Sequence, residues 1–522
     1  MKRDSTALTL SHFDLLVCGG GVYGAWTAYD AALRGLNVAL IDKADWAGAT
    51  SSASSKLIHG GLRYLESYDF KLVNKSLRER GLLLKAAPHC VWPLRFGVPI
   101  YADGRISRIT LKIGLILYDL LAGIPGALMR HRYFNSGQFA RRFSALEKDG
   151  IRGGFTYADA QTDDARLVLE LIAGAQAAGA VCVNYCELIA LNEMNGKATG
   201  ATLRDNLNGQ SFEIRAKQVV ITSGQWLAAV ETNRAWCRLS KGVHIILPKI
   251  LDDEALLLTA KSDGRVFFMI PWYGLTLDGT TDTVYLGDIE HVTVETTDVD
   301  YLLREVNRYL NANWTGADVI GSYAGLRVMR HSDDASPSAV SRDWELKTTG
   351  NGVHYSIGGK LTSAREDAAE IVDAVCMQLG VDAACGTNGR AFPWAPEEFA
   401  TWSAVIAGQA HRLGIDAECS KWLIRRYGKR TLDILREIES VPALAERIVS
   451  TLPFLYAELL FCARTEMVVH LDDLLRRRIP LLILARLTQI ELESIAAFVS
   501  GVLDWNEDRV MREVKACHTI GS

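Results

Sequence analysis

The segment from residue 13 to residue 42 contains the motif that most constrains the fold of this chain. It begins with a short apolar run and continues through Gly19-x-Gly21-x-x-Gly24 into a helical pattern of small residues. A second apolar run then ends in Asp42, 18 residues beyond Gly24, where a carboxylate can accept hydrogen bonds from ribose hydroxyls. A strand, a tight turn, a helix and a second strand that ends in an acid form the dinucleotide-binding βαβ unit. We therefore predict a parallel α/β sheet that binds a nucleotide at this turn.

Each part of the motif has a physical role. Gly19 permits the turn, Gly21 lets the backbone approach a pyrophosphate, and Gly24 lets the helix pack closely on the sheet. The first helical residues, Val22 and Tyr23, present unpaired N–H groups and the positive end of the helix dipole to the phosphates. The sequence thus predicts phosphate binding by backbone groups.

The segment that follows narrows the class of protein. From Thr50 to Glu66 it reads TSSASSKLIHGGLRYLE, in which small hydroxyl residues lead into basic and aromatic ones. Such a run is unusual for a plain NAD-binding domain. It resembles the signature of the flavin-dependent glycerol-3-phosphate dehydrogenases, which have the fold of the D-amino-acid-oxidase and glycine-oxidase group. The resemblance implies that the βαβ unit binds the ADP part of FAD and that the next segment runs beside the flavin.

The resemblance also implies the domain organisation, over residues 14–380 strongly and 397–510 moderately. A chain of 522 residues exceeds one ordinary core. We expect an α/β fold with a Rossmann-like FAD-binding domain and an antiparallel-sheet substrate domain, interleaved over 13–385, and a C-terminal all-helical domain over 397–522. We assign to the FAD-binding parts residues 13–95, 153–240 and 335–380, and to the substrate sheet residues 96–152 and 241–334.

A second glycine pair, Gly358-Gly359, precedes Lys360. A strand that ends in Gly-Gly at the start of a helix again presents N–H groups to an anion or to a polar ring edge. In the family this loop lies over the pyrimidine side of the flavin. The residues that we expect to bind the cofactor are Gly19, Gly21, Val22, Tyr23, Gly24, Asp42, Thr50, Ser51, Ser55, Lys56, Leu57, His59, Ser223, Gly224, Trp226, Gly359, Lys360, Leu361 and Thr362.

A phosphorylated substrate requires fixed cations, and the planar fork of arginine suits phosphate. Arg63, Arg327 and Arg342 fall on the family's positions in HGGLRY, GLR and SRDW. An intramolecular salt bridge is the alternative role for Arg327 and Arg342, because a lone arginine in an apolar strand is costly. The residues that we expect to bind the substrate are Arg63, Tyr64, Thr281, Arg327, Arg342 and Lys360, and Thr280 would add a second hydroxyl beside Thr281.

Oxidation of a secondary alcohol needs a base for the hydroxyl proton while hydride leaves carbon. His59 and His244 are equal candidates, and deprotonation assisted by Arg327 is a further possibility. A satisfied core histidine is the alternative role for His244, which lies on an apolar strand. Lys360 would stabilise the negative charge that flavin reduction leaves near N1. We expect no metal, because no His/Cys/Asp cluster has ligand spacing.

Composition and charge limit the partners and the cellular compartment that we expect for the protein. A net charge of −4 gives no general argument for nucleic acid, and we expect none as a partner. The ten cysteines are scattered and form no CxxC pair, which favours reduced thiols in a cytoplasmic protein. The N-terminus lacks the apolar core of a signal peptide.

The apolar segment 113–129, which follows Arg108 and Lys112, admits two interpretations. It fits a core helix, which we favour, or a segment that enters a membrane surface. The resemblance supports the membrane, because relatives that pass electrons to quinone lie on the cytoplasmic face of the inner membrane. The amphipathic C-terminal helices would suit a homodimer or another partner, although a solvated face is the simpler interpretation.

The resemblance implies FAD-dependent oxidation of sn-glycerol 3-phosphate to dihydroxyacetone phosphate by hydride transfer to flavin N5. The electrons would pass to quinone or another acceptor. Departures from the family pattern cluster at the substrate end, where Val328 replaces the proline of GVRP and Ser363-Ala364 replaces Thr-Tyr in GGKLTTYR. A dehydrogenase of another polyol phosphate, such as erythritol phosphate, is therefore one alternative. The others are an oxygen-using oxidase of an amine or hydroxy acid, and a non-catalytic flavin-binding or tRNA-modifying-type protein.

Overall fold

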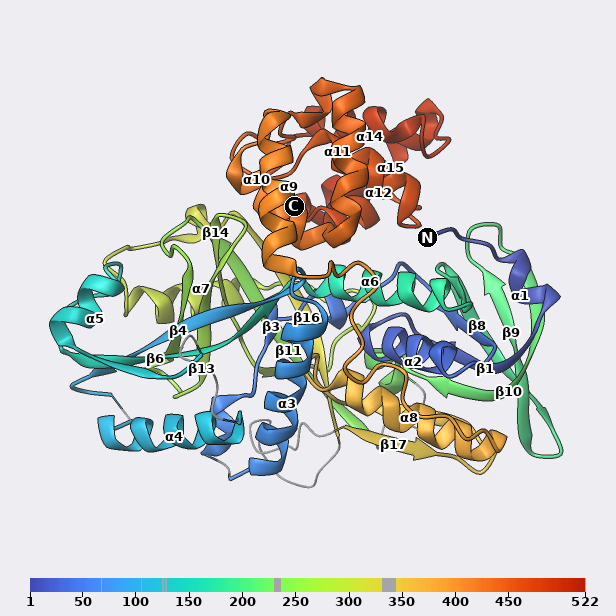
Figure 1. Ribbon diagram of the computed structural model, residues 1–522, viewed down its shortest axis with the longest axis horizontal. Coiled ribbons are helices and arrows are strands. Elements are labelled where there is room, and N and C mark those ends of the chain that lie inside the picture. Colours follow the sequence, from blue (N-terminus) through green and yellow to red (C-terminus); the bar gives the residue numbers. More distant parts are fainter. Residues whose placement is uncertain are drawn as a thin grey trace.

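The computed structural model describes residues 1–66, 68–104, 106–123, 126, 129–229, 236–330 and 344–521. It has two large sheets side by side and a helical domain that covers one side of both, so the predicted α/β architecture with a C-terminal helical domain is confirmed (Figure 1). The strands are β1 (His12–Cys18), β2 (Val38–Ile41), β3 (Leu57–Ile58), β4 (Val91–Tyr101), β5 (Arg132–Asn135), β6 (Ile151–Thr162), β7 (Val181–Val183), β8 (Cys186–Met194), β9 (Lys197–Asp205), β10 (Ser211–Ile221), β11 (Cys237–Leu247), β12 (Glu254–Thr259), β13 (Val266–Trp272), β14 (Leu275–Gly279), β15 (Thr283–Val284), β16 (Gly321–Arg330), β17 (Glu345–Thr348) and β18 (His354–Ile357). The α-helices are α1 (Thr6–Leu10), α2 (Val22–Leu33), α3 (Phe70–Ala86), α4 (Arg108–Leu121), α5 (Ser136–Arg142), α6 (Asp164–Ala177), α7 (Thr296–Asn307), α8 (Ala364–Leu379), α9 (Phe399–Arg412), α10 (Ala417–Tyr427), α11 (Thr431–Ser440), α12 (Tyr456–Thr465), α13 (Leu481–Leu484), α14 (Gln489–Ser500) and α15 (Glu507–Gly521).

The first sheet is built around the predicted βαβ unit. Its strand order is β17-β18-β10-β1-β2-β7, and β1 is parallel to both β2 and β10. Helix α2 packs against α6 and α8, and its buried small residues allow that close packing. The end of β10 returns to this sheet beside β1, and β18 lies on its other side. The carboxyl ends of β1, β10 and β18 therefore meet at one edge, where ligands of such sheets bind.

The second sheet has the order β15-β11-β14-β13-β12-β4-β6-β3 and is mostly antiparallel. Several segments that we assigned to the FAD-binding part lie in this sheet instead: β3, the first residues of β4, residues 153–162 of β6 and the first residues of β11. Strand β6 pairs with β4 from Val91 to Tyr101, and most of its residues are buried. The chain crosses to the first sheet only after Thr162, through α6, because the length of this pairing holds β6 beside β4.

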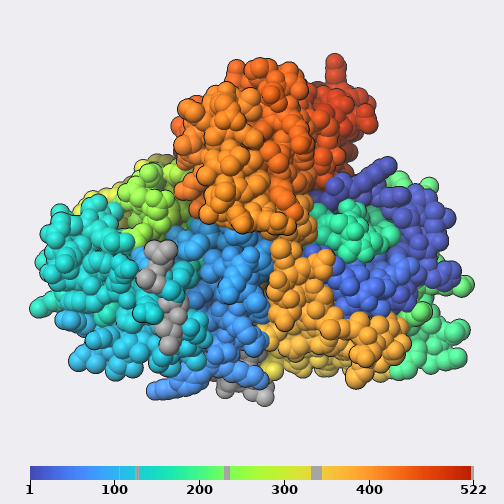
Figure 2. Space-filling view, viewed as in Figure 1, coloured from blue at the N-terminus to red at the C-terminus, as the bar shows by residue number. Residues whose placement is uncertain are grey.

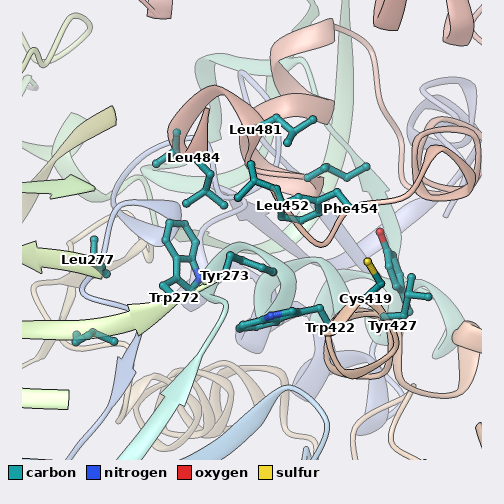
Figure 3. Packing of buried hydrophobic residues seen from close by; sticks show 14 of the residues in the cluster. Trp272, Tyr273, Leu277, Cys419, Trp422, Tyr427, Leu452, Phe454, Leu481 and Leu484 are labelled. Atoms are coloured by element: carbon teal, nitrogen blue, oxygen red, sulfur yellow. The ribbon is translucent and has the colours of Figure 1, made fainter. Parts of the chain in front are cut away.

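The C-terminal helices sit on top of both sheets (Figure 2). Aromatic residues form the contact with the second sheet, where the Tyr273 ring lies 4.0 Å from Trp422 and 4.8 Å from Phe454, measured between ring centroids (Figure 3). Burial of large aromatic side chains is among the strongest contributions to an interdomain contact. The helical domain is therefore joined to the second sheet by a shared apolar core.

Buried ion pairs join the helical domain to the first sheet. Arg166 of α6 binds both carboxylate oxygens of Glu466, at 2.5 and 2.9 Å, and Arg430 binds the same carboxylate at 2.8 Å. Burial alone would raise the pKa of Glu466, but the charges of Arg166 and Arg430 outweigh it and lower this pKa to about 2. A folded-state pKa below the unfolded one stabilises the protein above the unfolded pKa.

We predict that Glu466→Gln destabilises the protein at pH 7 by about 3–5 kcal/mol, because it leaves Arg166 buried without its bidentate partner. The stability that Glu466 contributes is complete above its unfolded pKa of 4.5 and is lost as the pH falls toward about 2. The thermal midpoint of the wild type should therefore approach that of the variant in acid. Differential scanning fluorimetry across this pH range measures both quantities.

Glu437→Gln is the matched control, since Glu437 pairs with the exposed Arg464 in the same domain. An exposed pair contributes about 0–1 kcal/mol, so this variant should behave as the wild type does. Equal midpoints for all three proteins at pH 7 would contradict the role given to Glu466.

Candidate active site

A cavity of about 1940 Å³ lies where the two sheets meet. One end is lined by the β1–α2 turn and β8, and the other by the 3₁₀ turn η2 (Leu62–Leu65) and strands β11, β13 and β16. Most of the residues predicted from the sequence line it. They are Gly19, Gly21, Val22, Tyr23, Asp42, Thr50, Ser51, Ser55, Leu57, His59, Arg63, Tyr64, Ser223, Gly224, Trp226, His244, Arg327, Gly359, Lys360, Leu361 and Thr362.

The glycine turn is closely packed at two points. Gly19 has a φ of +116°, and a Cβ there would lie 2.6 Å from the carbonyl oxygen of Thr222. A Cβ at Gly24 would lie 1.8 Å from the carbonyl oxygen of Gly19. Gly24 does not line the cavity, and its part is the packing of α2 that the motif predicts. These contacts leave the N-terminus of α2 directly beside the cavity.

Asp42 and Ser51 accept hydrogen bonds from backbone N–H groups at the start of α2. The Asp42 carboxylate accepts a hydrogen bond of 2.6 Å from the Gly20 N–H, and the Ser51 hydroxyl accepts one of 2.9 Å from the Val22 N–H. Burial raises the pKa of Asp42 to about 6, although the N–H groups of Ala44 and Gly20 oppose that shift. A backbone cradle with a carboxylate at the end of β2 fits the phosphates and ribose of a dinucleotide.

The second glycine loop packs against the first. A Cβ at Gly359 would lie 1.8 Å from the Tyr23 hydroxyl, and the Lys360 N–H donates to that hydroxyl at 2.9 Å. The Tyr23 hydroxyl donates in turn to Asp367 at 2.6 Å. Helix α8 begins at Ala364 and not at Lys360, so the residues between them form a loop along the cavity.

The side chain of Lys56, which we predicted to bind the cofactor, points away from the cavity. Its amine lies 2.6 Å from the Asp164 carboxylate and donates to the Ser52 carbonyl at 2.7 Å, and Lys56 does not line the cavity. Its φ of +59° turns it away from its neighbours Ser55 and Leu57, which do line it. Lys56 therefore ties the hydroxyl-rich run to the start of α6.

Arg327 is held at the other end of the cavity by the β14–β15 segment. Its guanidinium donates to the Thr280 hydroxyl at 2.9 Å and to the Thr281 carbonyl at 3.2 Å, and it lies 3.2 Å from the Asp282 carboxylate. Of the predicted pair Thr280-Thr281, only Thr280 lines the cavity. The Thr281 hydroxyl accepts from the buried Val243 N–H, so Thr280 is the threonine that faces the cavity. Arg342 lies outside the described residues.

Arg63, Tyr64 and Lys360 come together from η2 and the second glycine loop. The Arg63 guanidinium donates to the Tyr64 hydroxyl at 3.3 Å, and the Lys360 amine lies 3.9 Å from the centre of the Tyr64 ring. Burial lowers the pKa of Arg327, and the charge of Arg63 lowers it further, against the opposing pull of Asp282. Clustered cations that raise one another's energy favour an anionic ligand.

The two histidines flank this cluster in different environments. Burial lowers the pKa of His59 to about 4, and the charges of Lys360 and Arg63 contribute. His244 is stacked on Tyr323, its Nε2 lies 2.8 Å from the Ser55 hydroxyl, and burial lowers its pKa well below the usual range. Both imidazoles are therefore neutral at neutral pH and able to accept a proton.

The charged cavity residues that were missed from the sequence include Asp282 and Arg265. Asp282 directly follows the predicted pair Thr280-Thr281. Arg265 follows Gly264 at the turn before the apolar strand β13, and an arginine at a strand entrance was the available signal. The lining residues of β8, from Glu187 to Leu191, had no distinguishing pattern.

Comparisons with known proteins agree with this geometry. Residues 14–365 match the family model described as FAD dependent oxidoreductase, and residues 393–510 match the C-terminal domain of alpha-glycerophosphate oxidase. The chain is 34% identical to a glycerol-3-phosphate dehydrogenase of Synechocystis sp., over 97% of this chain and 96% of the relative. It is 36% identical to the aerobic glycerol-3-phosphate dehydrogenase of Bacillus subtilis, over 72% and 69% of the two chains.

A solved structure is also similar over nearly the full length. It is a glycerol-3-phosphate dehydrogenase from Bacillus halodurans complexed with FAD, with a TM-score of 0.80 and 28% sequence identity. The match covers 99% of this chain and 95% of that chain. The cofactor of the present chain is thus FAD, and the glycine cradle and the cavity fit it.

We predict that Gly359→Ala lowers the flavin content of the purified protein at least about tenfold, because the new methyl group would displace Tyr23 and the loop with it. The ratio of flavin to protein absorbance measures this loss. Gly350→Ala is the control, since a Cβ there has no heavy atom within 4 Å. Full flavin occupancy in Gly359→Ala would contradict the tight packing of the two loops.

Proposed function

The chain belongs to the family of FAD-dependent oxidoreductases that includes the glycerol-3-phosphate dehydrogenases, and from this membership we propose that it oxidises sn-glycerol 3-phosphate to dihydroxyacetone phosphate. The observation that carries the proposal is the convergence of Arg63, Arg327 and Lys360 on the end of the cavity opposite the nucleotide cradle. A cavity that joins a dinucleotide cradle to a cationic end suits a small phosphorylated alcohol.

Arg63 and Arg327 bind the phosphate of the substrate. Each guanidinium can donate two parallel hydrogen bonds to phosphate oxygens, and the partly buried site strengthens them. Thr280 and Asp282 hold the Arg327 guanidinium in place by its other N–H groups. The phosphate thereby fixes the position of the carbinol carbon, which contributes to the rate by orientation.

His59 is the base that removes the hydroxyl proton. Among the residues that the structure describes, none hydrogen-bonds to the His59 ring, whereas Nε2 of His244 is engaged with Ser55. The O–H proton moves to His59 while the carbinol carbon loses hydride, and the carbon–oxygen bond becomes a carbonyl. Bound FAD supplies the hydride acceptor at N5. Lys360 offers a positive charge beside the site that becomes more negative.

We predict that anaerobic addition of sn-glycerol 3-phosphate bleaches the flavin absorbance of the purified protein, whereas glycerol, glycine and lactate leave it unchanged. A panel with other polyol phosphates, such as erythritol 4-phosphate, ranks the substrates by reduction rate in stopped flow. His59→Gln should slow reduction by about 10²–10⁴-fold, the usual contribution of a general base.

His244→Gln is the comparison variant and should retain most of the reduction rate. If His244→Gln slows flavin reduction more than His59→Gln does, the role of base belongs to His244. Failure of every polyol phosphate to bleach the flavin would contradict the proposed function, and bleaching by glycine or lactate would favour an oxidase instead.

We also propose that the protein binds a membrane surface and passes its electrons to a quinone there. Helix α4 packs on the protein through Leu111, Leu115 and Tyr118, so the predicted core helix accounts for one face only. Its outer face exposes four large aliphatic residues at helical spacing. They are Ile109, Ile113, Ile116 and Leu120, which are 72%, 61%, 41% and 56% exposed.

The surroundings of this face suit a lipid surface. Arg108 and Lys112 lie exposed on the same helix and can reach anionic headgroups. The helix lies on the side of the molecule opposite the C-terminal helices and packs against η2, which contains Arg63 and Tyr64 (Figure 1). Among the described residues, no helix is long and apolar enough to cross a membrane. The outer face of α4 would thus bring the active site close to a lipid-soluble acceptor.

We predict that the wild type sediments with anionic phospholipid vesicles and that the double variant Ile113→Glu, Leu120→Glu loses at least about tenfold in binding, since each buried aliphatic contributes about 1.5–3 kcal/mol. Ile490→Glu, at an exposed aliphatic of α14, is the control. The rate of flavin reduction by substrate should be the same in all three proteins. Equal sedimentation of the double variant and the wild type would contradict this surface.

A further inference from the structure

Arg265 projects from the turn between β12 and β13 toward the same end of the cavity as Arg327. Its guanidinium donates to the Asp282 carbonyl at 2.5 Å, and its Nε lies 3.4 Å from the Asp263 carboxylate. Arg327 contacts the carboxylate of the same Asp282. Arg265 and Arg327 therefore contact the same residue, Asp282, the first at its carbonyl and the second at its carboxylate.

The turn that presents Arg265 is held firmly in place. The N–H groups of Lys261 and Ser262 donate to the buried Glu305 carboxylate of α7. The Tyr301 hydroxyl donates to the Asp263 carboxylate at 3.1 Å, and Gly264 adopts a φ of +75° that closes the turn. Arg265 is thus positioned by the second sheet and α7, and its side chain is 42% exposed, as expected of a group at the cavity entrance.

The local charge balance indicates an anion between these arginines. The positive charges of Arg63 and Arg265 both act on Arg327 and lower its pKa, in addition to the effect of burial, while Asp282 opposes them. The three guanidinium groups come from η2, β16 and the β12–β13 turn, and among the described residues the carboxylates of Asp282 and Asp263 pair with only two of them, Arg327 and Arg265. A doubly charged ligand would relieve that repulsion, whereas a singly charged carboxylate would do so only in part.

Building on the proposed function, we propose that Arg265 is a specificity-determining residue that completes the phosphate site from the cavity entrance. Arg63 and Arg327 bind the phosphate from inside, and Arg265 binds the outward-facing oxygens once the substrate has entered. The residue selects a terminal phosphate dianion over uncharged and singly charged alcohols. In this role Arg265 acts on binding and leaves the chemical step to the groups beside the carbinol.

The test titrates inorganic phosphate into the FAD-loaded protein by isothermal calorimetry. Arg265→Gln should weaken phosphate binding about ten- to a hundredfold, as expected for the loss of a charge-assisted pair of hydrogen bonds. Arg265→Lys should lie between the wild type and Arg265→Gln, because it keeps the charge and loses the planar fork. Lys261→Gln makes the same charge change in the same turn but does not line the cavity, and it should bind phosphate as the wild type does.

Steady-state kinetics with sn-glycerol 3-phosphate provides the second readout. Arg265→Gln should raise KM by a similar factor while kcat stays nearly unchanged, and a merely structural role would lower flavin content and kcat together. Equal phosphate affinities for Arg265→Gln and the wild type, or no measurable phosphate binding by the wild type, would overturn the inference. If glycerol 3-phosphate fails to reduce the wild-type flavin, the proposed function falls, and the phosphate titration still decides the role of Arg265.

Discussion

The close approach of two glycine loops is the constraint on which the rest of this structure depends. The β1–α2 turn packs against the end of β10, and the β18–α8 loop packs against Tyr23, at distances that a Cβ atom would prevent. These contacts bring the carboxyl ends of three parallel strands to one edge and leave the N-terminus of α2 facing the cavity. The cofactor cradle is therefore a product of backbone packing, and the side chains around it only refine it.

The opposite end of the cavity depends on charge that is only partly neutralised. Elsewhere buried arginines form ion pairs with buried carboxylates, for example Arg166 with Glu466 and Arg478 with Asp45. At the cavity, Arg327 pairs with Asp282 and Arg265 with Asp263, while Arg63 adds a third positive charge that acts on the partly buried Arg327. A buried positive charge without a partner is costly. Ion pairs remove that cost in the interdomain core, and an anionic ligand would remove it at the cavity.

The sequence predicted the three-part fold, and most of the site residues that it predicted line the cavity, because glycine spacing and strand–helix alternation reflect backbone geometry directly. It failed where the outcome depended on which way a side chain points. Lys56 turns away through a positive φ, and Thr281 faces the core while Thr280 faces Arg327. The placement of β6 depended on a pairing with β4, and pairing between distant segments leaves no local pattern. Arg265 was missed because its role depends on a turn that is positioned by α7, far along the chain.

The central claim is that one cavity holds the dinucleotide at the glycine loops and a phosphorylated alcohol at the arginine cluster. The most direct measurement is a crystal structure of the FAD-bound protein with glycerol 2-phosphate, an unreactive isomer of the proposed substrate. The account predicts the phosphate between Arg63 and Arg327, with the carbon skeleton extending toward His59. Phosphate density outside this arginine cluster, or a skeleton directed away from His59, would contradict it.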